Sequence, residues 1–166
     1  MFIPDTRVMS YKSPHHDATI DLIKNRNPEL KTKQCHILAM PILCTRSQNP
    51  GAGSELYIRY KAKGYFLELF SLDRYIAAFY EHQDVRDIEY LTQEVAKDCA
   101  NALGDKVTVE AYVNLNGVNQ RQEIVVKAEP LEEYREDLGK KSTQSKKIKR
   151  LNKLIGNRGE STLLKK

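Results

Sequence analysis

The chain has 166 residues, of which 40% are hydrophobic and 30% charged, and its formal net charge is +5. This length accommodates one domain and is short for two, and the hydrophobic content excludes a wholly disordered chain. No apolar run approaches the roughly 20 residues that cross a bilayer, and there is no charged-then-apolar leader, so we expect a cytoplasmic protein without a membrane partner.

Basic residues are concentrated toward the C-terminal end. Residues 140–166 contain ten Lys or Arg and one acidic residue, a net charge of +9, whereas the remainder has 17 basic and 21 acidic residues, a net charge of −4. A basic arm on a mildly acidic body is typical of proteins that hold nucleic acid, although a solvated tail has the same composition. The three cysteines cannot all pair, and their spacing matches neither a disulfide framework nor a compact metal motif, so we expect free thiols and no metal site.

The sequence before residue 55 predicts few regular elements. Residues 1–33 are expected to be irregular because three prolines interrupt them, and a short strand is predicted at "CHILAM" (35–40), where a further proline ends it. After the turn-forming stretch "QNPGAG", the segment "ELYIRYKA" (55–62) alternates as a half-buried strand does. The segment "GYFLELFS" (64–71) is its predicted hairpin partner.

Helical and then strand periodicity follows. Apolar residues recur at helical spacing over 72–79, and a second helix is predicted from about Val85 to Leu103, with Gly104 just past its end. Alternation returns at 106–115 and 121–127, and an Asn-Gly pair between them predicts a hairpin. The order of two strands, two helices and two strands favours an α+β fold, with one four-stranded antiparallel sheet and both helices on one face.

Such a sheet has two open edges. Closing a barrel with further copies of the chain would pair both edges, so we expect a homo-oligomer. The predicted domain covers residues 34–130, and residues 131–166 are predicted to form a polar, partly helical tail in which "KKIKRLNKLIG" indicates a short amphipathic helix. This helix could dock on the chain's own body, on nucleic acid or on a membrane surface. The candidate nucleic-acid-binding residues are Lys146, Lys147, Lys149, Arg150 and Lys153.

Cys44 is the most informative of the three cysteines. It directly precedes the loop "TRSQNPGAG" and a predicted strand, a position that suits either a reactive thiol or a small apolar residue before a turn. Glu68 lies between "FL" and "LF", so its carboxylate either meets a ligand or a cation, or faces solvent. Asp87 stands near a helix start, where an acidic residue is favoured on structural grounds alone. Cys99 falls among apolar residues of the second predicted helix and is expected in the core.

These residues resemble a known family. The segment "LCTRSQNP" is similar to the Cys-Pro-x-Thr-x-Gln-Pro segment of the 7-cyano-7-deazaguanine reductases, the QueF family. The segment "LELFSLDRYIAAFYEHQD" resembles that family's Glu-Ser-Lys-Ser-x-Lys-x-Tyr-Leu-x-Ser-Phe-x-x-His stretch, and the resemblance covers residues 42–127. The residues of this stretch that stand in register are Glu68, Ser71, Tyr75, Phe79 and His82.

The resemblance implies a tunnelling fold, in which copies of the four-stranded sheet close a barrel. It also implies that Cys44 attacks the nitrile of a 7-deazaguanine to give a covalent thioimide. The reductases then use NADPH in queuosine synthesis, whereas a QueF-like archaeal branch uses ammonia and makes the amidine of archaeosine in tRNA. The implied partner is a 7-deazaguanine base, free or within tRNA or DNA. The implied substrate-binding residues are Glu68, Asp87, Ser71 and His82.

Three positions depart from the family pattern. Gly51 stands where the family has an acid seven residues beyond the cysteine, which leaves Glu55 as the nearest acid that the loop could bring back. Phe70 and Asp73 replace two lysines of the NADPH motif, and an acid there repels phosphates. Arg86–Asp87 replaces a His-Glu pair. We therefore expect a QueF-like enzyme that does not use NADPH. An NADPH-dependent reductase and a non-catalytic oligomer that binds a base or nucleic acid are the alternatives.

Overall fold

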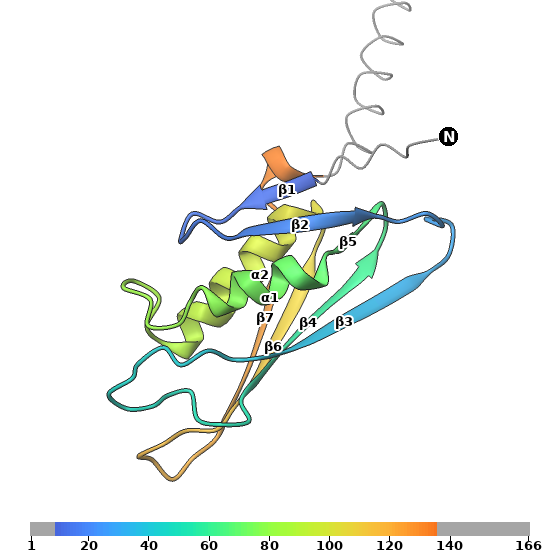
Figure 1. Cartoon of the computed structure of the whole chain (residues 1–166). Coiled ribbons are helices and arrows are strands. Elements are labelled where there is room, and N and C mark those ends of the chain that lie inside the picture. The colour runs from blue at the N-terminus through green and yellow to red at the C-terminus, as the bar shows by residue number, and fades with distance from the viewer. Residues whose placement is uncertain (1–8, 136–166) are drawn as a thin grey trace, which may run out of the picture. The chain divides into compact units, whose positions relative to one another are not determined.

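The computed structural model describes residues 9–135, which form two antiparallel sheets and two α-helices (Figure 1). One sheet has the strand order β1-β2-β5 and the other has the order β3-β4-β6-β7. Both helices contact strands of both sheets. The fold class is therefore α+β, as predicted. The elements are β1 (Met9–Lys12), β2 (Thr19–Lys24), β3 (Thr32–Ala39), β4 (Glu55–Ala62), β5 (Tyr65–Leu67), α1 (Leu69–Ala77), α2 (Ile88–Leu103), β6 (Val107–Val113), β7 (Gln122–Ala128) and the 3-10 helix η1 (Glu132–Tyr134).

Helix α2 forms because its apolar residues recur every three to four positions and both of its ends are capped. Leu91, Val95 and Cys99 are fully buried on the face that packs against β6 and β7. The Asp87 carboxylate accepts the backbone N–H of the third helical residue at 2.7 Å, which satisfies one of the unpaired donors of the first turn. Gly104 ends the helix with φ +68, a conformation that glycine adopts without steric cost, and this confirms the predicted end.

Strands β4 and β6 form the centre of the four-stranded sheet. Leu56 and Ile58 of β4 lie opposite Ala111 and Val109 of β6, and all four side chains are buried toward the helices. The residues between them point to the other face, which neither α1 nor α2 covers. The predicted hairpin of residues 106–115 and 121–127 is confirmed as β6 and β7.

The prediction that residues 1–33 are irregular is wrong for two segments, which form β1 and β2. Ile20 and Leu22 of β2 alternate with polar residues and are buried. Strand β2 is only six residues long and lies between two prolines, so its alternation was too short to outweigh the turn signals around it.

The predicted pairing of residues 55–62 with 64–71 is also wrong. Strand β4 pairs with β3, while β5 leaves this sheet and pairs with β2, with Leu67 opposite Leu22. The Tyr60 hydroxyl accepts the backbone N–H of Leu67 at 2.9 Å, and the Asn25 N–H donates to the Gly64 carbonyl at 2.8 Å. These contacts direct residues 65–67 away from β4 and toward β2. The alternation of apolar residues predicts a strand but not which strand it pairs with.

Neither sheet closes into a barrel within residues 9–135. The described residues up to Tyr134 belong to one compact unit, which contains β1, β2 and η1 together with the segment 34–130. The five basic residues predicted to bind nucleic acid, and most of the predicted tail, lie outside the described residues. In the part of the chain that is described, no helix is long and apolar enough to cross a bilayer.

Candidate active site

Cys44 lies in a compact turn between β3 and β4. The backbone N–H groups of Leu43 and Cys44 both donate to the Asn49 carbonyl, at 2.9 and 3.2 Å, and the Gln48 side chain donates to the Thr45 carbonyl at 2.6 Å. Leu43 is buried beneath this turn, whereas Cys44 is partly exposed. The thiol is therefore carried on an ordered loop and is not part of the core.

The β6–β7 connection fastens the Cys44 loop to the sheet. The Asn116 N–H donates to the Asn49 side chain at 2.7 Å, and the Asn49 amide donates back to the Asn116 carbonyl at 3.1 Å. The Asn116 amide also donates to the Gln48 carbonyl at 2.7 Å. Reciprocal bonds of this kind between two loops restrict the motion of both, so the thiol has a defined direction.

The environment of Cys44 favours the thiolate. Hydrogen bonds from the Ser47 hydroxyl and N–H, with smaller contributions from the Arg46 N–H and the Arg86 guanidinium, lower the pKa of Cys44 to about 7. Cys99 provides the contrast within the same chain, because full burial raises the pKa of its thiol well above the ordinary value. Donors and a cation around a partly exposed sulfur are the features of a reactive cysteine.

Glu81 places a carboxylate at the same loop. The Thr45 hydroxyl, on the residue next to Cys44, donates to the Glu81 carboxylate. Glu81 has φ +47, an uncommon conformation for a residue other than glycine, and its N–H donates to the Ile42 carbonyl at 3.0 Å. The turn after α1 is thus held against the Cys44 loop with the carboxylate directed at it.

The position seven residues beyond the cysteine cannot hold an acidic side chain without rearrangement. The Gly51 N–H donates to the Asn114 carbonyl at 2.7 Å, and a Cβ on Gly51 would lie 3.0 Å from that oxygen. Glu55 is in β4, opposite Ala39 and Tyr112, and lines a cavity of about 580 Å³ that Ile42 and Gln48 also line but Cys44 does not. The expectation that Glu55 returns to the cysteine has no support in this geometry.

Glu68 is the N-cap of α1 and does not lie in a strand. Its two carboxylate oxygens accept the N–H groups of Phe70 and Ser71 at 2.9 and 2.7 Å. Desolvation is the largest single influence and opposes ionisation, but the Phe70 and Ser71 N–H groups, the Ser71 hydroxyl and Arg74 together outweigh it and lower the pKa of Glu68. Because α1 rises about 15 Å between Glu68 and the turn near Cys44, one copy of the chain does not bring the two residues together.

The other two predicted substrate-binding side chains are engaged within the fold. Ser71 is fully buried, and its hydroxyl accepts the Asp21 N–H and donates to the Glu68 carbonyl, so it is not available to a substrate. The His82 ring accepts the N–H groups of Asp84 and Val85 and contacts the His15 carbonyl at 2.9 Å. His82 therefore shapes the α1–α2 connection that presents Arg86 to Cys44.

Asp87 is exposed at the start of α2, directly after Arg86. One of its carboxylate oxygens caps the helix, and the other has no hydrogen bond among residues 9–135. Arg86 and Glu81 of the α1–α2 connection thus lie at the Cys44 loop, and Asp87 directly follows Arg86. Sequence reasoning missed Arg86 and Glu81 as site residues, because Arg86 was considered only as a departure from the family's His-Glu pair, Glu81 matches no residue of the family stretch, and only the fold joins this connection to the cysteine.

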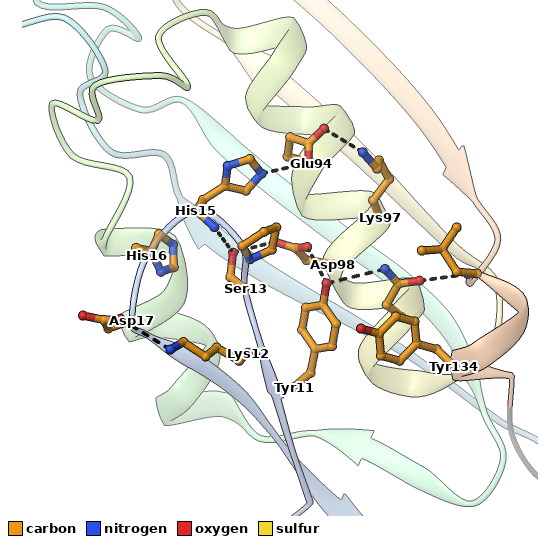
Figure 2. Close-up of a pocket in the computed structure, with 13 residues that line it drawn as sticks. Tyr11, Lys12, Ser13, His15, His16, Asp17, Glu94, Lys97, Asp98 and Tyr134 are labelled. Atoms are coloured by element: carbon orange, nitrogen blue, oxygen red, sulfur yellow. Dashed lines mark hydrogen bonds and ion pairs between the residues drawn. The ribbon is translucent and has the colours of Figure 1, made fainter.

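A second cavity of about 730 Å³, between the β1–β2 loop and α2, does not include Cys44 (Figure 2). Asp98 of α2 accepts the hydroxyls of Tyr11, Ser13 and Tyr75 at 3.0, 2.9 and 2.6 Å, and His15 contacts Glu94 at 2.8 Å. Because Asp98 accepts three hydroxyls, this network holds β1 against the helices. The role of these side chains is therefore structural.

The histidines near this network do not form a metal centre. The His16 ring packs edge-on against Phe79, with the ring centres 4.6 Å apart, and burial lowers the pKa of His16, so the ring is neutral near pH 7. Both of its ring nitrogens are buried without a hydrogen-bond partner. Among residues 9–135, no group of three or more His, Cys, Asp or Glu side chains is arranged to hold a metal ion.

The fold and the loop define an α+β protein with a partly exposed cysteine on an ordered loop, an arginine against its sulfur and a carboxylate beside it. A scan against protein-family models found no match to this chain, and a search of the curated proteins found none either.

Proposed function

We propose that the chain is a QueF-like enzyme that acts on the C7 substituent of a 7-deazaguanine, through a thioimide on Cys44 and without NADPH. The observation that carries the proposal is the state of Cys44: a partly exposed thiol whose pKa is lowered to about 7 by the Ser47 hydroxyl and other donors. A nitrile carbon is a modest electrophile, and a thiolate is the strongest nucleophile among the side chains.

In the proposed reaction the Cys44 sulfur forms a bond to the nitrile carbon while one π bond of the nitrile breaks. The electron pair moves to the nitrile nitrogen, which takes up a proton, and the product is a thioimide with no change in oxidation state. The Arg86 guanidinium stabilises the thiolate before attack. An amine such as ammonia then displaces the sulfur and gives an amidine, a step that needs no hydride.

Glu81 is the proton carrier in this proposal, because its carboxylate is held by Thr45, next to the nucleophile. It accepts the proton from the thiol and passes it to the nitrile nitrogen. Proton transfer by a positioned group contributes about 10²–10⁴ in rate. Glu81→Gln should therefore slow thioimide formation about 10²-fold while the protein still binds the base. Glu89→Gln, which changes an exposed glutamate of α2, is the control and should keep the wild-type rate. Equal rates in the two variants would remove Glu81 from the mechanism.

Two carboxylates are proposed to read the base. One carboxylate oxygen of Asp87 has no hydrogen bond among residues 9–135, and Asp87 directly follows Arg86. A carboxylate accepts well from the amino and ring N–H groups of a guanine-like edge. Glu68 keeps further lone pairs beyond its two capping bonds. Since Glu68 lies at the far end of α1, it would have to come from a second copy, across a seam between subunits of a homo-oligomeric barrel. The base is free or within tRNA or DNA, and the basic tail would assist in the nucleic-acid case.

NADPH use is disfavoured by the start of α1. Phe70 and Asp73 are exposed there, at the positions where the family has lysines, so neither of these positions supplies a cation to the cofactor's phosphates. This is the feature that separates the proposal from the reductase alternative.

The test is to incubate the full chain with 7-cyano-7-deazaguanine and to measure its intact mass. We expect an increase by the mass of one base, no increase in Cys44→Ala, and no loss of NADPH absorbance when that cofactor is added. Consumption of NADPH would favour the reductase. Binding of the base without any covalent adduct would contradict the proposal and favour the non-catalytic oligomer.

A further inference from the structure

Basic side chains gather around a cavity of about 580 Å³ at the end of the four-stranded sheet that is far from Cys44. Five of the ten residues that line it are Lys or Arg, and one, Asp105, is acidic. The chain outside the C-terminal 27 residues has a net charge of −4, so this concentration of positive charge is local. Along β4, Lys61 lies six residues from Glu55, about 20 Å away. The cavity is therefore distinct from the Cys44 loop.

The strand register places two of these lysines directly against each other. Lys33 of β3 lies opposite Lys61 of β4, and two residues along the same face Cys35 lies opposite Arg59. Like charges directly opposite each other on neighbouring strands are destabilising. Both lysines are exposed, and neither forms an ion pair with any residue from 9 to 135.

Only part of the positive charge around the cavity is neutralised by the fold. Lys63 pairs with Asp105 at 2.8 Å, and Arg59 pairs with Glu110 at 3.3 Å. Lys33, Lys61 and Lys106 remain without an acidic partner in the described part of the chain. The three lysines come from β3, from β4 and from the residue before β6. At the usual spacing of neighbouring strands, their backbones together span about 10 Å.

We propose that this cavity binds a ligand with consecutive phosphate groups. Lysine ammonium groups bind phosphate oxygens as point charges, and three of them on β3, on β4 and just before β6 match a row of phosphates better than a single one. The opposed pair of Lys33 and Lys61 costs stability in the free chain, and an anion between the two ammonium groups removes this repulsion. The row of phosphates belongs either to a free polyphosphate or nucleotide, or to the backbone of a nucleic-acid strand. The proposal does not depend on the chemistry of Cys44.

The experiment titrates the full chain with tripolyphosphate at low salt, by calorimetry. The test variant is Lys33→Gln with Lys61→Gln, and the control is Lys24→Gln with Arg26→Gln, which removes the same charge from exposed positions outside the cavity. We expect the dissociation constant to rise at least about tenfold in the test variant and to change less than about twofold in the control. Because the lysines repel each other, the test variant should unfold at or above the wild-type temperature, which shows that any loss of binding is not a loss of fold.

A second arm repeats the comparison with a labelled single-stranded RNA oligonucleotide, followed by fluorescence anisotropy, with the same tail present in every variant. Weaker binding of both probes in the test variant supports the cavity and identifies a nucleic-acid backbone as a ligand. Weaker binding of tripolyphosphate alone supports the cavity with a free phosphate compound as the ligand. Equal affinities in the test and control variants, or no saturable binding of tripolyphosphate by the wild type, would overturn the proposal.

Discussion

At the scale of single residues, Cys44 and Cys99 show how far the surroundings of a thiol decide its reactivity. Cys99 is fully buried in α2, where desolvation raises the pKa of its thiol, so it is inert. Cys44 has hydroxyl, amide and guanidinium donors around it, and the pKa of its thiol falls to about 7. About half of Cys44 is therefore thiolate at neutral pH, whereas Cys99 remains protonated.

This difference predicts the pH dependence of alkylation. The rate at which iodoacetamide modifies Cys44, measured by mass spectrometry between pH 5 and pH 9, should rise through a midpoint near pH 7 and then level off. Arg86→Ala removes a cation that favours the charged sulfur, so the midpoint should move to higher pH and the rate at pH 7 should fall. Arg26→Ala, at an exposed position away from the loop, should leave the profile unchanged. An unshifted profile in Arg86→Ala would contradict the proposed contact.

At the scale of elements, patterns that are local in sequence predicted most of the fold. Both helices, the strand 55–62 and the final hairpin are present, and Gly104 ends α2 as expected. One error is local, since β1 and β2 were expected to be irregular. The others concern pairing over long range. Strand β5 joins β2 because of the Asn25 turn and the Tyr60 hydroxyl, and β3 takes the place beside β4. The same limit applies to the site, since Glu81 reaches the Cys44 loop only through the fold.

The attachment of β1 to the helices gives a prediction about stability. Asp98 is buried and accepts three hydroxyls, from Tyr11, Ser13 and Tyr75. Asp98→Ala leaves these hydroxyls without their acceptor, so the free energy of unfolding in urea should fall by about 3 kcal/mol. Asp73→Ala, on the exposed side of α1, should change it by less than about 0.5 kcal/mol. A similar small change in both variants would show that the network does not fasten β1.

At the scale of the whole molecule, the described chain has a four-stranded antiparallel sheet, as predicted, but β3 stands in it where residues 64–71 were expected, and β3 and β7 are its open edges. Ile37 on β3 and Val125 on β7 are 57% and 60% exposed, so apolar surface accompanies the unpaired backbone groups of both edges. Cys44 and Glu68 lie at opposite ends of α1, and the proposed site is complete only if a second copy supplies Glu68. Oligomerisation and catalysis are thus one hypothesis and not two.

The central claim is that the Cys44 sulfur attacks the substrate, and locating the covalent bond tests it most directly. The full chain would be incubated with 7-cyano-7-deazaguanine, digested, and its peptides sequenced by tandem mass spectrometry. The account predicts the mass of one base on the peptide that carries Cys44 and unmodified peptides for Cys35 and Cys99. An adduct on another cysteine, or a base that binds while Cys44 stays unmodified, would contradict it.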